Sequence, residues 1–288
     1  MNSIRLWRSL LFTPANRRDL VEKAFRSKAD AIILDLEDSV PPSEKAVSRQ
    51  FVATWLQENS ERTDRIGVRM NGLRTIDGFY DVIALAEQST MPGFIVLPKV
   101  ESAAELQIIG ILLKQNSESC HSVALIESAA GLEMANIISN APVRLRALLF
   151  GAADLTSDLG AENSRHGLLY ARSRVVQAAA SAKIEAIDSP CFVLSDEETL
   201  RAELATALEL GFTGKAAIHP KQIDAINQAF TPSPEAIDEA HQILAAAKNG
   251  VGIVHGKMVD IAMVRRAHRT LARCSPELLE KDEKAPKQ

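Results

Sequence analysis

Cysteine is scarce in this chain of 288 residues, which has only Cys120, Cys191 and Cys274. The three cysteines are isolated and odd in number, so the sequence contains neither a disulfide framework nor a Cys-x-x-Cys metal site. Scattered free thiols are typical of proteins from a reducing compartment. We therefore expect a cytoplasmic protein.

The chain also lacks an excess of positive charge and a long apolar run. Its 33 Lys and Arg are balanced by 37 Asp and Glu, for a formal charge of −4, which argues against nucleic acid as a partner. No apolar run approaches the roughly 20 residues of a membrane span. The first apolar run is broken by Arg8 and is followed by no cleavage-site pattern. Neither a membrane partner nor a secretion signal is predicted.

What the chain does contain is a regular alternation of strand-forming and helix-forming segments. Eight apolar segments predict strands at residues 7–13, 31–36, 65–71, 93–99, 122–126, 147–150, 185–188 and 215–219. Helical spacing lies between them at 41–58, 76–88, 101–114, 129–138, 165–182 and 196–210, and Asn16 is a candidate cap for a first helix to about residue 27. This alternation predicts an α/β fold, a (β/α)8 TIM barrel. One strand fewer would favour an open sheet.

The barrel is expected to be a single catalytic domain over residues 1–230, because no linker-like stretch interrupts it. Residues 231–274 are surplus to a barrel and predict a C-terminal helical extension that acts as a lid or an interface arm. Its helices are expected at 234–248 and up to about residue 273. The charged, proline-bearing residues 275–288 predict a flexible tail.

The stretch at 121–160 places one carboxylate just past each of two predicted strands. Glu127 follows the first strand and Asp154 follows the second. Because parallel strands end at the same rim, the two carboxylates are expected to converge. Converging carboxylates are suitable ligands for a hard cation such as Mg²⁺. The spacing is equally compatible with two acids that only stabilise helix N-termini through the helix dipole.

A second acidic group follows the predicted strand at 31–36. With a period of two, Asp35 and Glu37 share the face of Ile33, which we expect to meet the barrel interior. Arg69 lies near the end of the next strand and is either a functional residue, which we favour, or an ion-pair partner of Asp35 or Glu37. The remaining polar residues at strand ends are Asn71, Lys99, Asp188 and His219. Polar residues gathered at one end of the strands are typical of a barrel active site.

Eight segments, in order along the chain, resemble the citrate lyase β-subunit-like family of the HpcH/HpaI aldolase superfamily, which includes malyl-CoA and citramalyl-CoA lyases. They are RSLLFTPAN (8–16), DLEDSVPPSEK (35–45), VRMN (68–71), LPKVES (97–102), IESAAGL (126–132), FGAADLTSDLG (150–160), GFTGKAAIHPKQI (211–223) and MVD (258–260). The resemblance covers residues 5–272 and implies a (β/α)8 barrel with a C-terminal extension.

The resemblance implies roles for four residues. Glu127 and Asp154 match the magnesium ligands, with Glu127 also near the substrate, and Arg69 matches an arginine that contacts the substrate. Asp260 matches the acid/base carried on the C-terminal extension, which in related lyases reaches the active site of a neighbouring subunit. Without the resemblance, Asp260 would be interpreted as an ordinary acid at a helix N-terminus.

The resemblance also implies contacts to an acyl-CoA and to the metal's surroundings. The positions that match acyl-CoA contacts are Phe12, Lys23, Ile218 and His219. For His219, a packed histidine before Pro220 is an equal alternative. The acidic cluster is matched by Asp35, Glu37 and Asp38, of which Glu37 would hydrogen-bond water on the metal or orient Arg69. Two departures from the family pattern are Asp19 in place of a second basic residue and Ala153 in place of a glutamate.

Together these features predict a Mg²⁺-dependent carbon–carbon lyase that cleaves a short 3-hydroxyacyl-CoA of the malyl, citramalyl or citryl type to acetyl-CoA and a 2-oxo acid. Citramalyl-CoA is slightly favoured. The alternatives are a CoA-independent class II aldolase of the pyruvate type, and the β subunit of a citrate lyase complex that needs an acyl-carrier partner. The expected partners are the acyl-CoA substrate and further copies of the chain, as a trimer or hexamer.

Overall fold

The computed structural model describes residues 7–113, 120–248 and 252–274. The chain forms two compact units, Met1–Asn227 and Gln228–Gln288. The first unit contains the barrel, and the expected boundary of a catalytic domain at residue 230 stays a prediction. The expected tail at 275–288 lies outside the described residues.

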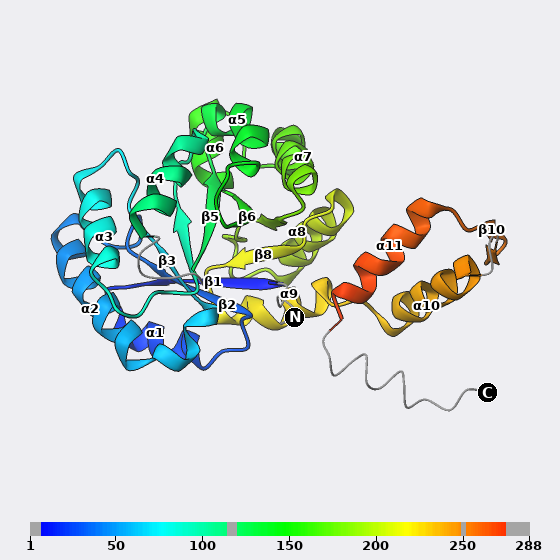
Figure 1. Ribbon diagram of the computed structural model, residues 1–288, viewed down its shortest axis with the longest axis horizontal. Helices are drawn as coiled ribbons and strands as arrows, with labels where there is room; N and C mark the ends of the chain where they lie inside the picture. Colours follow the sequence, from blue (N-terminus) through cyan, green and yellow to red (C-terminus); the bar gives the residue numbers. More distant parts are fainter. Residues whose placement is uncertain (1–6, 114–119, 249–251, 275–288) are drawn as a thin grey trace. The chain divides into compact units, whose positions relative to one another are not determined.

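Eight parallel strands close into a barrel in chain order (Figure 1), which confirms the predicted fold class. The strands are β1 (Ser9–Pro14), β2 (Ala31–Asp35), β3 (Ile66–Arg69), β4 (Phe94–Leu97), β5 (His121–Ile126), β6 (Leu145–Phe150), β7 (Glu185–Asp188) and β8 (Gly214–Ala217). The barrel closes where Ser9 of β1 lies opposite Lys215 of β8. Because all the strands run in one direction, their carboxyl ends form a single rim.

Helices surround this barrel (Figure 1). They are α1 (Arg18–Phe25), α2 (Lys45–Glu58), α3 (Ile76–Ala86), α4 (Ala103–Leu113), α5 (Ala129–Ser139), α6 (Ala152–Leu159), α7 (Arg165–Ala182), α8 (Glu197–Leu210) and α9 (Ile223–Phe230), with 3₁₀ turns at Pro42–Glu44, Ser60–Arg65 and Pro220–Gln222. The long helix α7 has the bounds that its helical spacing predicted.

The sequence prediction missed the helices α6 and α9 and was wrong about the N-cap of α1. Residues 152–159, where no helix was predicted, form α6, in which Leu155 and Thr156 are buried together with Ala152. The N-cap of α1 is Arg17 rather than Asn16. Asn16 instead donates its amide to Glu44 Oε2 at 2.7 Å, which ties the β1 loop to the turn before α2.

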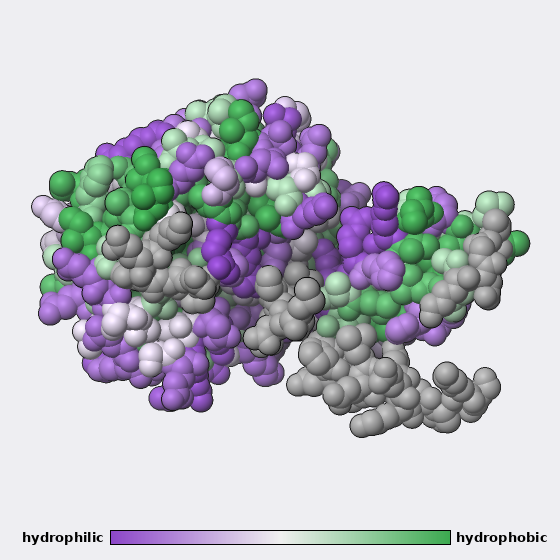
Figure 2. All heavy atoms as spheres, viewed as in Figure 1, coloured by the Kyte–Doolittle hydropathy of each residue, from purple (hydrophilic) through white to green (hydrophobic). Residues whose placement is uncertain are grey.

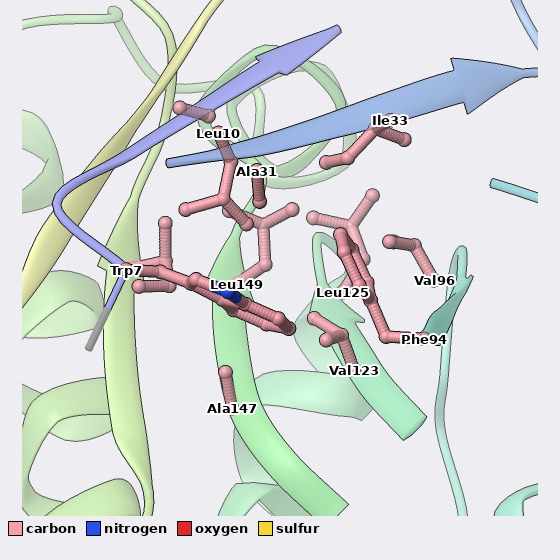
Figure 3. Close-up of a cluster of buried hydrophobic side chains, with 12 residues drawn as sticks. Trp7, Leu10, Ala31, Ile33, Phe94, Val96, Val123, Leu125, Ala147 and Leu149 are labelled. Carbon is pink, nitrogen blue, oxygen red and sulfur yellow. The ribbon is translucent and has the colours of Figure 1, made fainter. Parts of the chain in front are cut away.

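Alternate residues of the strands fill the barrel interior with apolar side chains (Figure 3). Ile33 lies in this cluster, so the face of β2 that carries Asp35 points inward, as its period of two predicted. The ring of Phe94 occupies the space beside β3, where Gly67 has no side chain. A Cβ on Gly67 would lie 2.1 Å from Phe94 Cε2. The core therefore depends on a glycine in one strand to admit an aromatic ring from the next.

The second unit has its own small core. Helices α10 (Pro234–Lys248) and α11 (Ile261–Ala272) are joined by an antiparallel hairpin of β9 (Ile253–Val254) and β10 (Lys257–Met258). The buried residues of this core are Ala240, Ile243, Val254 and Ala267. The helices agree with the prediction, and the hairpin was not predicted. The role of this unit as a lid or an interface arm stays a prediction.

No helix in the described ranges combines the length and the apolarity needed to cross a bilayer.

Replacement of Gly67 by alanine tests how tightly the interior is packed. We expect Gly67→Ala to lower the free energy of unfolding by about 1–3 kcal/mol, because the added methyl group must displace the Phe94 ring. Gly72→Ala is the matched control, since a Cβ there would meet nothing within 4 Å. Urea denaturation measures both, and equal stability of the two variants would contradict this account of the core.

Candidate active site

The acids and bases expected from the sequence lie at the carboxyl rim of neighbouring strands. Asp35 is the last residue of β2 and Arg69 the last residue of β3, and the two face each other in the strand register. Glu127 follows β5 directly, and Asp154 lies in the first turn of α6, just after β6. Parallel strands thus bring residues distant in sequence to one end of the barrel.

Arg69 is held by a bidentate ion pair. Its Nε and Nη2 donate to the two oxygens of Asp35 at 2.6 and 2.7 Å, and its Nη1 lies 3.0 Å from Glu37 Oε2. The guanidinium also lies 5.0 Å from the ring centroid of Phe12. Burial alone would lower the pKa of Arg69, but the hydrogen bonds and charge of Asp35 raise it. Arg69 is therefore a fixed cation with one remaining nitrogen, Nη1, outside its pair with Asp35.

Lys99 is a second cation of the rim, and the sequence reasoning gave it no role. Its Nζ donates to Glu37 Oε1 at 2.9 Å and lies 4.0 Å from Asp154 Oδ2. Its backbone N–H donates to Glu127 Oε1 at 2.9 Å. Lys99 adopts φ 50°, a left-handed conformation that costs energy for a residue with a side chain. The motif LPKVES contained this residue, but no pattern in it signalled the unusual backbone angle.

Glu127 is a buried carboxylate whose negative charge is poorly compensated. Glu127 is only 3% exposed. Its side chain packs closely against the backbone of Gly151, because a Cβ on Gly151 would lie 2.7 Å from Glu127 Oε2. Burial, followed by the negative charges of Glu37 and Asp154, raises its pKa to about 8. Burial likewise raises the pKa of Glu37, although Arg69 and Lys99 oppose this. More negative charge is gathered here than the two cations stabilise.

The residues fit a divalent cation held by two carboxylates. The described residues contain no cluster of three or more His, Cys, Asp or Glu suited to a metal, and Glu127 and Asp154 line the same cavity as a pair of acids. Glu37 Oε2 accepts no hydrogen bond from the described chain, even though Arg69 Nη1 is within ion-pairing distance. Mg²⁺ usually keeps several positions for water and substrate oxygens, so two carboxylates suffice.

Two cavities meet at these carboxylates. One, of about 420 Å³, is the more polar of the two and is lined in part by Asn71, Arg74, Lys99, Glu101, Ser128 and Asp158. The other, of about 450 Å³, is mainly apolar and is lined in part by Phe12, Leu125, Leu149, Phe150, Phe192 and Ile218. Glu127 and Asp154 line both. A ligand with an apolar arm and a polar head would place the junction between them beside the acids.

The other expected site residues lie in different settings. Asp38 is exposed, with Oδ2 3.5 Å from Arg69 Nη1, and lines the apolar cavity. Lys23 is exposed on α1. His219 accepts the Lys221 N–H through Nδ1 at 3.1 Å, so it caps a 3₁₀ turn. Neither Lys23 nor His219 is among the described residues that line the two cavities.

Asp260 belongs to the second unit and is the N-cap of α11. Its Oδ1 accepts the backbone N–H of Met263 at 2.7 Å. This is the helix-terminal role that the sequence alone suggested for it. Its carboxylate is exposed and therefore accessible from solvent. Its predicted role as the acid/base stays a prediction.

The fold and site define a class of protein: a (β/α)8 barrel with a pair of acids and a buried arginine at its carboxyl rim. The chain belongs to the HpcH/HpaI aldolase/citrate lyase family, whose model matches residues 8–220. This confirms the family that the sequence motifs suggested.

Similar proteins extend the match over nearly the whole chain. The citrate lyase subunit beta of Leuconostoc mesenteroides subsp. cremoris is 35% identical over 286 residues, 94% of this chain and 94% of that protein. The L-malyl-CoA/beta-methylmalyl-CoA lyase of Cereibacter sphaeroides is 34% identical over 292 residues, 90% of this chain and 92% of that protein. The structure of CitE from Mycobacterium tuberculosis with magnesium, acetoacetate and coenzyme A superposes with a TM-score of 0.78 at 31% identity, covering 94% of this chain and 98% of that one.

The raised pKa of Glu127 predicts a pH-dependent stability in metal-free protein. Because the pKa of Glu127 is raised in the folded state, its contribution to the free energy of unfolding is fully present below about pH 4.5 and is lost as the pH rises to about 8. Glu127→Gln keeps an oxygen for the Lys99 N–H but does not ionise. We therefore expect the variant to gain a few kcal/mol relative to the parent between pH 5 and pH 8.5.

Urea denaturation in EDTA at several pH values measures this difference. Glu197→Gln is the control, since the Glu197 side chain is 88% exposed and should show no such trend. A difference between Glu127→Gln and parent that stays constant with pH would show that Glu127 is not a buried, uncompensated acid.

Proposed function

We propose that this protein is a Mg²⁺-dependent carbon–carbon lyase that cleaves a short 3-hydroxyacyl-CoA to acetyl-CoA and a 2-oxo acid. Family membership and the names of the relatives support the reaction class. The observation that carries the proposal is that Glu127 and Asp154 line both an apolar cavity and a more polar one, and that Arg69 lines the apolar cavity beside them. We also propose a cytoplasmic location, which is supported only by the sequence.

Glu127 and Asp154 are assigned as the residues that hold the metal. The relative from Mycobacterium tuberculosis was solved with magnesium, which supports the choice of ion. When bound, Mg²⁺ supplies Lewis-acid stabilisation of negative charge on substrate oxygens. The Lys99 N–H fixes Glu127 Oε1, and Gly151 leaves room for the Glu127 carboxylate, so the main chain orients this donor. Glu37, paired with both Arg69 and Lys99, keeps these two cations beside the pair of acids.

Cleavage breaks the bond between the carbinol carbon and the α-carbon of the thioester. The hydroxyl gives its proton to solvent and becomes the carbonyl of the oxo acid, and the electron pair of the broken bond passes into the acetyl-CoA enolate, which takes up one proton that solvent resupplies through Asp260. Arg69 lines the apolar cavity and is assigned to stabilise the enolate oxygen. Because Asp35 occupies Nε and Nη2, Nη1 is the nitrogen that would do so. Asp260 is assigned to return the proton to the α-carbon.

The apolar cavity is assigned to the acyl-thioester arm. Phe12 and Ile218 line it, as the family resemblance implied for acyl-CoA contacts. Lys23 and His219 remain proposed contacts to the more distant parts of the coenzyme, and Lys23, as an exposed cation on α1, suits its phosphates. The polar cavity, with Arg74 and Ser128, would then take the oxo-acid end.

A second candidate is the β subunit of a citrate lyase complex, which needs an acyl-carrier partner. The relative named citrate lyase subunit beta supports it at 35% identity. A CoA-independent pyruvate-type aldolase is less well supported, because the apolar cavity beside the acids has no role in it.

An activity panel with the purified chain tests the proposal. With Mg²⁺ we expect cleavage of at least one of citramalyl-CoA, malyl-CoA and citryl-CoA to acetyl-CoA, loss of cleavage in EDTA and recovery with added Mg²⁺. Saturable inhibition by free CoA would separate this reaction from that of the CoA-independent aldolase. If none of the three esters is cleaved unless an acyl-carrier partner is added, the complex subunit is the correct function.

Two substitutions of Asp260 separate acid/base chemistry from helix capping. Asparagine is as good an N-cap as aspartate but cannot transfer the proton, whereas alanine does neither. We expect both Asp260→Asn and Asp260→Ala to lower kcat by about 100-fold or more while Mg²⁺ affinity is unchanged, and only Asp260→Ala to lower the melting temperature. Near-normal turnover of Asp260→Asn would leave Asp260 with a capping role alone.

A further inference from the structure

The side chain of Gln222 links the segments that follow two neighbouring strands. Gln222 ends the 3₁₀ turn after β8 and is only 4% exposed. Its Oε1 accepts the backbone N–H groups of Ile218 and His219, at 3.1 and 3.3 Å. Its Nε2 donates to the backbone carbonyl of Cys191, in the loop after β7, at 2.8 Å. One buried amide thus joins two loops of the barrel rim, and both ends of the amide are hydrogen-bonded.

Both of these segments form part of the wall of the apolar cavity. Ile218 lines the cavity directly after β8, and Pro190 and Phe192 line it from the loop after β7. Cys191, which lies between Pro190 and Phe192, is 1% exposed, and its Sγ donates to the carbonyl of Val193 at 3.6 Å. Phe192 itself is 53% exposed, so little packing holds its ring. The position of this part of the wall therefore depends on how its backbone is held.

The strand beneath the loop has separate anchors. Asp188 ends β7, and its two oxygens accept hydrogen bonds from Lys215 Nζ at 2.7 Å and from Arg172 Nε at 3.1 Å. Beyond Asp188 the chain leaves the sheet, and Gln222 ties it back to the end of β8 at Cys191. Loss of the Gln222 amide would consequently release the wall of the cavity while the strand stays in place.

We propose that Gln222 is a positioning residue for the acyl-thioester arm of the substrate. By holding the segments after β7 and β8 together, it fixes Phe192 relative to Ile218 and so sets the width of the cavity. Gln222 itself is absent from the described lining of both cavities, so it acts through the residues that it holds. The inference rests on the proposed function, which assigns the apolar cavity to this arm. A wall held in place before binding favours affinity, because less order has to be imposed on it when the arm enters.

Replacement of Gln222 by methionine tests the proposal. Gln222→Met keeps an unbranched side chain of similar length that can neither donate to Cys191 nor accept from Ile218. We expect the KM for the cleaved CoA ester and the dissociation constant of acetyl-CoA to rise by about fivefold or more, while kcat and Mg²⁺ affinity stay within about twofold of the parent. A merely structural residue would instead lower kcat through a smaller active fraction and leave KM unchanged. That result would overturn the proposal.

Thr213→Val is the matched control, because Thr213 joins the same two strands near their amino ends. Its Oγ1 donates to the carbonyl of Ala186 at 3.0 Å and accepts the Ala186 N–H at 3.1 Å. Valine has nearly the same shape and removes both hydrogen bonds. We expect this variant, like Gln222→Met, to lower the melting temperature but to leave KM and acetyl-CoA affinity unchanged. An equal rise of KM in both variants would show that any loosening of these strands weakens binding, which is contrary to the proposal.

Hydrogen exchange of the unsubstituted chain keeps the test independent of the folding of any variant. Acetyl-CoA should slow exchange at the amides of Ile218 and His219 and in the loop at 191–194, because an occupied cavity keeps its wall in place. Apolar side chains are also exposed on α3, and hydrophobic surface gathers over α3 and α4 in the space-filling view (Figure 2). The amides of α3 therefore report non-specific binding of the coenzyme, and we expect no change there.

The exchange data also separate this inference from the proposed function. If the parent binds no acetyl-CoA and cleaves no ester, both are wrong. If the parent cleaves an ester but acetyl-CoA leaves the amides of Ile218 and His219 unchanged, or slows those of α3 equally, only the role of Gln222 is overturned.

Discussion

The ion pair between Arg69 and Asp35 is the contact on which the site depends. It joins the ends of β2 and β3 by two short hydrogen bonds in a nearly water-free setting. Breaking one partner of such a pair would leave a buried charge unpaired, so both residues are held in place. Glu37 then links Arg69 to Lys99, and Lys99 links Glu37 to Glu127 through its backbone. The position of the acids thus follows from a chain of charged contacts across β2, β3 and the loops after β4 and β5.

This network leaves a surplus of negative charge at Glu127. In the metal-free protein, burial and the neighbouring negative charges raise the pKa of the Glu127 carboxyl, which lowers the stability of the fold at neutral pH. A divalent cation between Glu127 and Asp154 would remove this cost. The same physical fact therefore accounts for a weakness of the metal-free fold and for its proposed affinity for Mg²⁺.

The sequence predicted most of the fold and a defined part of the site. Strands were predictable because apolar runs alternate regularly with helices, and the inward face of β2 followed from its period of two. Helix α6 was missed because small and hydroxyl residues favour turns locally, whereas in the fold Ala152 and Leu155 pack on its buried side. The role of Lys99 was beyond prediction, since it comes from a positive φ and from contacts to two different loops. The ligands Glu127 and Asp154 and the acid/base Asp260 stay predictions, although the structure brings the first two to the same cavities.

Direct measurement of metal binding tests the central claim, that Glu127 and Asp154 hold one divalent ion. Titration with Mn²⁺, followed by electron paramagnetic resonance and by competition with Mg²⁺, gives stoichiometry and affinity without any substrate. The account predicts one site per chain, weakened at least tenfold in both Asp154→Asn and Glu127→Gln. An unchanged affinity in either variant, or no site in the parent protein, would contradict it.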